Sequence, residues 1–145
     1  MRIERRNAAA ALVEARDLVE ANWKETGFDI PFNPNPDLYD LAEQANSWFG
    51  LAVYDHDVMI GYSSAWLMRH PFNPDVIFAT SEALYVKPAY RHSMVPARLI
   101  KATEQEAKAI GAVRMMWHTR AGTRFADMLR KRGYEDLDVV VMKEL

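Results

Sequence analysis

A strand that runs directly into a helix constrains this chain more than any other feature. Residues 76–86 form an apolar run typical of a strand, and residues 99–110 have the apolar spacing of a helix. At such a corner, the free backbone N–H groups and the positive dipole end of the helix point beyond the strand. The sequence therefore predicts an α/β fold with an anion-binding turn at this corner.

Length and composition are those of one soluble domain. The chain has 145 residues, of which half are hydrophobic and 26% are charged. It has no cysteine, which excludes disulfides, thiolate metal sites and a cysteine nucleophile. No apolar run approaches the ~20 residues of a membrane span, and the first residues lack the apolar stretch of a secretory signal. We expect a single domain over residues 1–145 and a cytoplasmic location.

The charges are distributed unevenly along the chain. Residues 87–132 carry eleven Lys and Arg against three Asp and Glu, whereas the rest carries seven against seventeen. One interpretation is two solvated faces of opposite sign. The other is that the basic part meets a polyanion and the acidic part meets a cation. Nucleic acid is disfavoured as the polyanion, because the pI is 6.1 and no nucleic-acid motif is present.

The remaining patterns predict the order β-α-α-β-β-β-α-β-α-β. Helical spacing follows a possible cap at Asn7 and continues to about Thr26, and Asn35-Pro36 opens a second helix. Strands are expected at 1–5, 48–54, 58–68, 76–86, 113–118 and 137–143, with a hairpin turn at 55–57 and a helix at 122–132.

The residues after position 86 also follow a known sequence motif. They resemble the acyl-CoA-binding turn V-x-P-x-Y-R-G-x-G-x-G/A-x-x-L-L of the Gcn5-related N-acetyltransferases (GNAT). The matching residues are Val86, Pro88, Tyr90, Arg91, Leu99 and Ile100, whereas the three small positions hold His92, Met94 and Pro96. The resemblance covers nearly the whole chain and is closest to small bacteriophage or bacterial members. It implies a mixed, mostly antiparallel sheet with splayed central strands and about four flanking helices.

The resemblance also implies an acetyl-CoA site at this turn. Ser93 suits the helix N-cap, and Pro96 is tolerated in the first turn although it lacks an N–H donor. Arg91, Arg98 and Lys101 would offset that loss through charge. The alternative is an ordinary strand-to-helix turn with a basic surface. The implied cofactor-binding residues are Leu84, Tyr85, Val86, Arg91, His92, Ser93, Met94, Val95, Pro96, Ala97 and Arg98.

Glu82 is the candidate general base. By alternation it shares a face of its strand with Phe78, Thr80, Leu84 and Val86. A carboxylate among apolar neighbours is costly unless it is used or paired, and desolvation would tune it as a base. The resemblance places the family's common catalytic glutamate at this position. The alternative is a glutamate that is paired with an arginine or turns outward at a bulge.

The usual general acid of the family is missing. Its helix motif N-x-x-A-x-x-x-Y-x-x-x-G-F would place Asn at Gly122 and Tyr at Leu129. His118, at the end of the strand expected beside 76–86, is the nearest substitute, since histidine titrates in the range for acid or base work. A hydrogen-bonded structural histidine is the alternative. His56, His70 and His92 are expected on the surface, without metal-ligand spacing.

The combined interpretation is an N-acetyltransferase in which a primary amine attacks acetyl-CoA directly. No metal is expected, and the acceptor is a small, peptide or protein amine. The aromatic and acidic loop 28–34 is expected to wall its site or to be a solvated acidic loop. A homodimer fits this interpretation. The alternative is a catalytically idle binding or virion-associated module of the same fold.

Overall fold

The computed structural model describes residues 1–27 and 29–145. The elements are β1 (Arg2–Arg5), α1 (Ala8–Glu14), α2 (Arg16–Thr26), α3 (Pro36–Gln44), β2 (Trp48–Asp55), β3 (Val58–His70), β4 (Asn73–Val86), a 3-10 turn (Pro88–Tyr90), α4 (Val95–Ile110), β5 (Ala112–Met116) and α5 (Arg124–Lys131). None of the described helices combines the length and the apolarity that crossing a bilayer requires.

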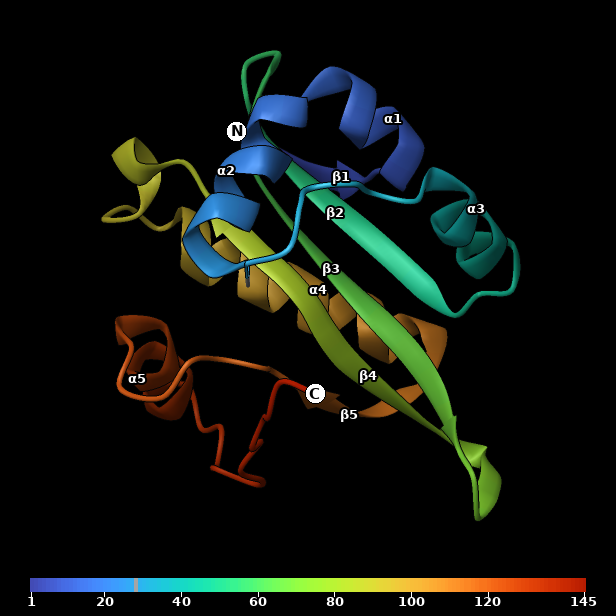
Figure 1. Ribbon diagram of the computed structural model, residues 1–145. Coiled ribbons are helices and arrows are strands. Elements are labelled where there is room, and N and C mark those ends of the chain that lie inside the picture. The colour runs from blue at the N-terminus through green and yellow to red at the C-terminus, as the bar shows by residue number, and fades with distance from the viewer. Residues whose placement is uncertain (28) are drawn as a thin grey trace.

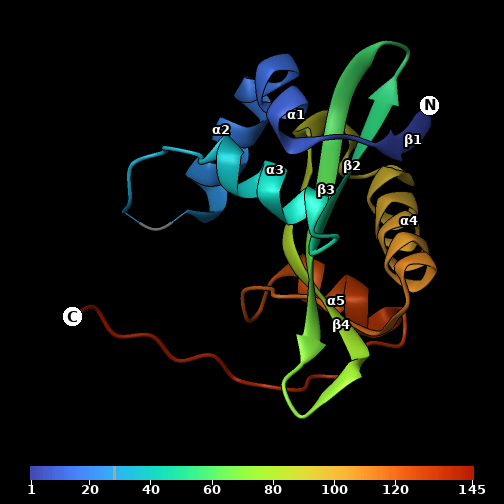
Figure 2. The same ribbon diagram turned by 90° about the vertical axis from the view of Figure 1, so that its right-hand side faces the viewer.

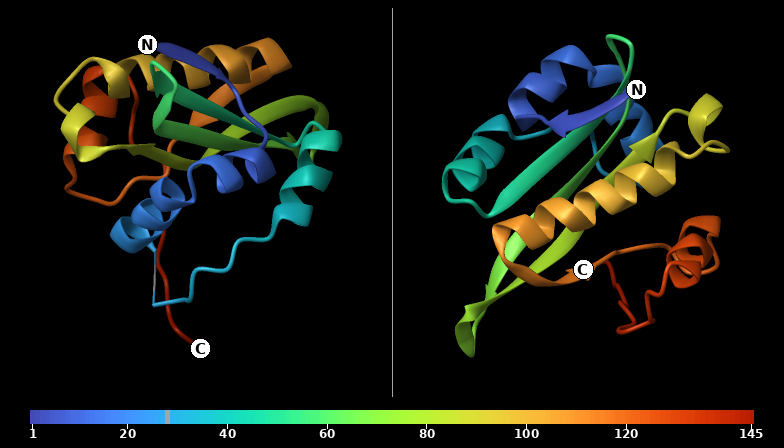
Figure 3. Two further views of the ribbon diagram at one scale, coloured as in Figure 1. Left: turned by 90° about the horizontal axis from the view of Figure 1, so that it is seen from above. Right: turned by 180° about the vertical axis from the view of Figure 1, so that it is seen from behind.

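The strands form one mixed sheet in the order β1-β2-β3-β4-β5 (Figures 1 and 3). The first four pair antiparallel with their neighbours, and β5 lies parallel to β4. A parallel pair needs a long crossover connection, and α4 supplies it. The predicted mixed, mostly antiparallel sheet is confirmed.

Helices cover both faces of the sheet (Figure 2). On one face, α4 buries Val95, Leu99 and Ala107 against the strands in the main core. On the other face, Leu18 of α2 packs on Ala52, Tyr54 and Tyr85, and α1 and α3 meet around Trp48. The sheet is thus packed between two layers of helices.

The strands β4 and β5 separate halfway along β4. Their register runs from Ile77 opposite Ala112 to Thr80 opposite Met116. Beyond Thr80, the backbone N–H of His118 donates to Ser81 Oγ at 2.9 Å, and β4 continues alone to Val86. This confirms the predicted splay and leaves the last residues of β4 without a strand on that side.

The helix expected over residues 7–26 is in fact two helices. Asn7 caps α1 as predicted, accepting the N–H of Ala10, but the chain breaks at Ala15 (φ −141°, ψ 45°). Ala15 is buried against the sheet together with Leu18, whereas Ala8 packs beside α3. One straight helix could not pack Ala8 beside α3 and Leu18 on the sheet, although the apolar period continues through both segments. The period alone therefore predicted a single helix.

The predicted strand at 137–143 is wrong. The described chain after α5 has no regular secondary structure, and its apolar residues lie in solvent, with Val139 88% and Val141 88% exposed. The tail extends away from the sheet in Figure 2. Strand propensity is a weak guide where no neighbouring strand supplies pairing.

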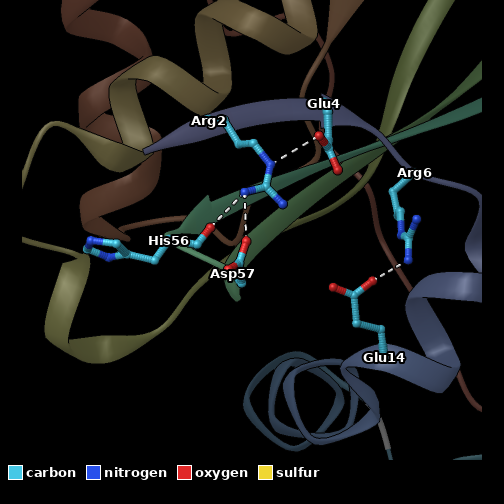
Figure 4. Close-up of polar contacts among 6 residues, drawn as sticks. All are labelled: Arg2, Glu4, Arg6, Glu14, His56 and Asp57. Atoms are coloured by element: carbon cyan, nitrogen blue, oxygen red, sulfur yellow. Dashed lines mark hydrogen bonds and ion pairs between the residues drawn. The ribbon is translucent and has the colours of Figure 1, made fainter.

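The hairpin turn between β2 and β3 is confirmed, with His56 in the left-handed region at φ 53°. Arg2 of β1 donates to the His56 carbonyl at 2.7 Å and pairs with Asp57, and Arg6 pairs with Glu14 of α1 (Figure 4). These contacts hold β1 and α1 against the end of the sheet. The His56 side chain is 93% exposed, as expected for a surface residue.

Candidate active site

Glu82 occupies a β-bulge next to the point where β4 and β5 separate. Ser64 pairs with Ala83 and the next residue, Ala65, pairs with Ser81, so Glu82 has no partner on β3. A bulge redirects side chains and is common beside functional sites. Because of it, Phe78 and Thr80 share the α3 side with Glu82, whereas Leu84 and Val86 belong to the core under α4. The predicted common face is therefore correct only before the bulge.

Three donors surround the Glu82 carboxylate. Tyr39 of α3 donates to Oε1 at 2.5 Å, and Trp48 Nε1 and Ser64 Oγ donate to Oε2 at 2.7 and 2.8 Å. The expected burial of Glu82 among apolar neighbours is wrong, since Glu82 is exposed and its carboxylate contacts the polar groups of these three side chains. The arrangement instead presents a fixed carboxylate to the groove that runs beside β4.

Aromatic rings form the wall behind this carboxylate. Tyr39 meets Trp48 edge-on at 5.2 Å between centroids and stacks on Trp66 at 5.9 Å. Burial and the nearby Glu82 raise the pKa of Tyr39, so its phenol stays protonated and remains a donor. The sequence does not predict this cluster, because no spacing rule joins residues so far apart in the chain.

The turn from β4 to α4 lines the same groove. The helix begins at Val95 after Met94, and the Ser93 hydroxyl accepts the N–H of Val95 at 3.2 Å. The N-cap is therefore Met94 and not Ser93 as we predicted, while Pro96 is in the first turn as expected. Among the described residues, no partner is found for the backbone N–H groups of His92, Met94 and Ala97.

Arg91 is already engaged within the protein. Its Nε donates to the Val86 carbonyl at 2.7 Å, and its Nη2 contacts both oxygens of Glu25 on α2 at 2.7 and 2.9 Å. The guanidinium also lies over the Tyr85 ring at 5.2 Å. These contacts fasten α2 to the end of β4, a role that the motif alone did not indicate.

The other predicted cofactor residues divide into two groups. Leu84, Tyr85, Val86, His92, Ser93, Pro96 and Ala97 line the groove with Arg91. In contrast, Arg98 points to Met1, with 3.8 Å from Nη1 to Sδ, and neither it nor Lys101, Met94 or Val95 belongs to the groove lining. Arg98 projects from the side of α4 away from Pro96, and Lys101 follows Ala97 by one full turn, farther from the start of the helix.

Arg124 is a groove residue that sequence analysis missed. It begins α5 after the cap Thr123, and its Nη1 lies 3.2 Å from His92 Nδ1 in the turn before α4. A cation from a distant segment therefore stands beside the His92 side chain in this turn. No local spacing could have indicated it, because its partner His92 lies 32 residues earlier in the sequence.

His118 lies in the groove but not against Glu82. Its backbone N–H bonds Ser81, its side chain is exposed, and no hydrogen bond joins its imidazole to Glu82 within the described chain. Leu129, at the family's tyrosine position, is buried and brings no titratable group. Gly122 has φ 71° in the turn before α5, a conformation that favours glycine.

The loop expected to wall the acceptor site is partly described. Phe28 lies outside the described residues, whereas Phe32 and Pro34 line the groove together with Trp23. Trp23 Nε1 donates to the Ile30 carbonyl at 2.9 Å, and its ring lies 6.5 Å from Phe32. Asp29 is exposed. The loop therefore forms an aromatic edge of the groove, fixed to α2.

The class of the protein follows from a comparison with known families. Residues 13–134 match the model of the acetyltransferase (GNAT) family, and the chain belongs to that family. It is an acetyl-CoA-dependent N-acetyltransferase. No curated protein gives a significant match.

Solved structures show the same fold at low sequence identity. An aminoglycoside acetyltransferase, meta-AAC0020, from an uncultured soil metagenomic sample superposes with TM-score 0.77 and 20% identity over 99% of this chain and 95% of that one. AAC(6')-Iy, bound to a CoA bisubstrate analogue, gives TM-score 0.73 and 20% identity over 99% and 97%. A ribosomal-protein-alanine N-acetyltransferase from Brucella melitensis biovar Abortus 2308 gives 0.72 and 12% over 99% and 100%.

Proposed function

We propose that this protein transfers the acetyl group of acetyl-CoA to a primary amine, with Glu82 as the general base. The observation that carries the assignment of residues is that the fixed carboxylate of Glu82 lines the same groove as His92 and Ala97, whose backbone N–H groups at the start of α4 have no partner among the described residues. Anions are favoured at a helix N-terminus, which suits the CoA pyrophosphate. The backbone of β4 residues 84–86, which has no pairing strand on the β5 side within the described chain, would bind the pantetheine arm.

Each bond change in this mechanism is accounted for. The acceptor arrives as an ammonium, with a pKa of about 10, and gives one proton to the Glu82 carboxylate. The neutral nitrogen attacks the thioester carbon, and collapse of the tetrahedral intermediate breaks the C–S bond. The second nitrogen proton passes to water or to the departing thiolate as the amide forms, and Glu82 returns its proton to solvent. Backbone N–H groups near residues 84–86 would stabilise the oxyanion. The thiolate leaves without a tyrosine acid, because a thiol pKa near 8.5 makes it a fair leaving group.

Phosphate recognition is proposed to rest on the turn and on Arg124. Arg124 supplies the charge that Arg91 has committed to Glu25. Charge-assisted contacts to phosphate are stronger than neutral ones, so Arg124 would compensate in part for the donor that Pro96 lacks. His118 remains a candidate for assisting the thiolate, since it lies in the groove.

The acceptor class is an amine-bearing small molecule or peptide. The similar structures include enzymes for aminoglycosides and for a ribosomal-protein alanine, and both acceptors present a cationic amine. The carboxylate and aromatic wall around Glu82 suit such a cation. A homodimer, a cytoplasmic location and a bacteriophage source stay predictions.

The test is a turnover assay with acetyl-CoA and a panel of an aminoglycoside, a polyamine and a peptide with N-terminal alanine. Released CoA can be measured with a thiol reagent free of protein background, because the chain has no cysteine. We expect thiol release that depends on one acceptor class, with a mass gain of one acetyl group on that acceptor. Tight acetyl-CoA binding without turnover on any amine would instead support the catalytically idle module, which the missing tyrosine favours.

A further inference from the structure

The three donors to Glu82 contact different oxygens of its carboxylate, since Tyr39 donates to Oε1 and Trp48 and Ser64 donate to Oε2. This difference bears on which oxygen can accept the proton of the substrate. This inference rests on the proposed function and adds one element, α3, to its machinery. The helix begins with Asn35, whose side chain accepts the N–H of Leu38, and with Pro36 at its first turn. This cap fixes the start of α3 one turn before Tyr39, and so fixes where the phenol can reach.

The Tyr39 ring has little freedom to move. It is wedged between Trp48 from β2 and Trp66 from β3, at centroid distances of 5.2 and 5.9 Å. Aromatic contacts of this kind add stability beyond the buried area. The hydroxyl is thereby delivered to Glu82 Oε1 at 2.5 Å, across 43 residues of sequence.

Counting acceptor sites distinguishes the two carboxylate oxygens. A carboxylate offers about four lone-pair positions in total, two on each oxygen. Trp48 and Ser64 take both positions on Oε2, whereas Tyr39 takes one position on Oε1. The position left for a substrate proton is therefore on Oε1, the atom that Tyr39 holds.

We propose that Tyr39 is a positioning residue for catalysis, which orients Glu82 Oε1 toward the acceptor amine. The phenol can only donate in this contact, because Glu82 is the acceptor and the pKa of Tyr39 is raised by burial and by that carboxylate. Loss of the hydroxyl would leave the carboxylate held through Oε2 alone, with both lone-pair positions of Oε1 open to water. The helix α3 would then be part of the acceptor site rather than only a cover for the sheet.

The test compares Tyr39→Phe with the wild type in the turnover assay described above, using whichever acceptor releases CoA. Phenylalanine keeps the ring packing and removes only the hydroxyl. We expect kcat to fall by roughly 10- to 100-fold, the effect of losing a hydrogen bond to a charged group, with the KM for acetyl-CoA unchanged. The acidic limb of the pH–rate profile should move to higher pH, since a donor that favours the carboxylate is lost.

Two matched variants separate this role from simple destabilisation. Tyr54→Phe removes a buried hydroxyl on β2 outside the groove and should leave kcat and the pH profile unchanged. Tyr39→Phe in a Glu82→Gln background should cost little more than Glu82→Gln alone, because Tyr39 acts through that carboxylate.

Full activity of a folded Tyr39→Phe protein, or an additive loss in the double variant, would overturn the positioning role and leave the proposed function intact. If the wild type acetylates no amine in the panel although acetyl-CoA binds, the proposed function fails first and this inference falls with it. A thermal melt of each variant confirms that the folded protein is being compared.

Discussion

At the scale of single residues, the site depends on one irregularity that a periodic pattern cannot predict. Glu82 was identified from the sequence, but the alternation rule placed it with Leu84 and Val86, which lie on the other face. A bulge inserts one residue and reverses every side chain after it. Its position depends on the pairing with Ser64 and Ala65 of β3, and so on contacts that local spacing does not contain.

Arg124 offers a direct test of the phosphate contacts at this scale. Arg124→Ala should weaken acetyl-CoA binding by about 1.5–3 kcal/mol, the range for a hydrogen bond to a charged group. The affinity of the wild type should also fall as salt is added, because exposed charges are screened. Isothermal calorimetry measures both effects. Arg5→Ala, which removes the same charge beside Glu106 outside the groove, is the control and should bind normally. Equal affinities for the two variants would remove Arg124 from the site.

At the scale of elements, the order of strands and helices was largely predictable, since capping residues and apolar periods are local. Asn35-Pro36 opened α3 as expected, and Pro96 lies in the first turn of α4. Two predictions failed where tertiary contacts decide. The break at Ala15 serves packing on two different neighbours, and the tail after α5 has the composition of a strand but no partner.

The tail provides a prediction for this scale. Because Leu137, Val139 and Val141 are 69–88% exposed, deleting residues 137–145 should remove little buried area. The melting temperature should change by less than about 2 °C, which corresponds to a few tenths of a kcal/mol in a domain of this size. Thermal unfolding followed by circular dichroism makes the comparison. A loss of many degrees would mean that this segment is paired in solution, as the sequence pattern suggested.

At the scale of the whole molecule, the basic and acidic segments of the chain both contribute side chains to one groove. The basic segment contributes the turn before α4 and Arg124 of α5, and the acidic remainder contributes Glu82 and Glu25. One groove thus has a cationic end for a polyanion and a carboxylate for an ammonium. The charge count alone could not place these groups in one groove, because it contains no information on how the segments pack.

Global stability should depend on pH in the alkaline range. Burial raises the pKa of Tyr134 to about 12 and also raises the pKa values of Tyr39 and Tyr62 above their ordinary value of 10.0. A group with a raised folded-state pKa contributes stability that is complete below its unfolded pKa. We therefore expect the free energy of unfolding to fall from about pH 10 to about pH 12. Urea titrations across this range measure it, and Tyr134→Phe should flatten the slope. A constant free energy up to pH 11 would contradict the burial of these phenols.

The central claim is that Glu82 takes the proton from the acceptor amine, and the pH dependence of Glu82→Gln tests it most directly. Glutamine keeps the shape of the side chain but cannot accept the proton. The variant should bind acetyl-CoA as the wild type does and lose roughly 10²–10⁴-fold in rate at neutral pH. The deficit should shrink as the pH approaches the acceptor's own pKa of about 10, where the amine loses its proton unaided. A folded Glu82→Gln protein with wild-type rate at pH 7 would contradict the account.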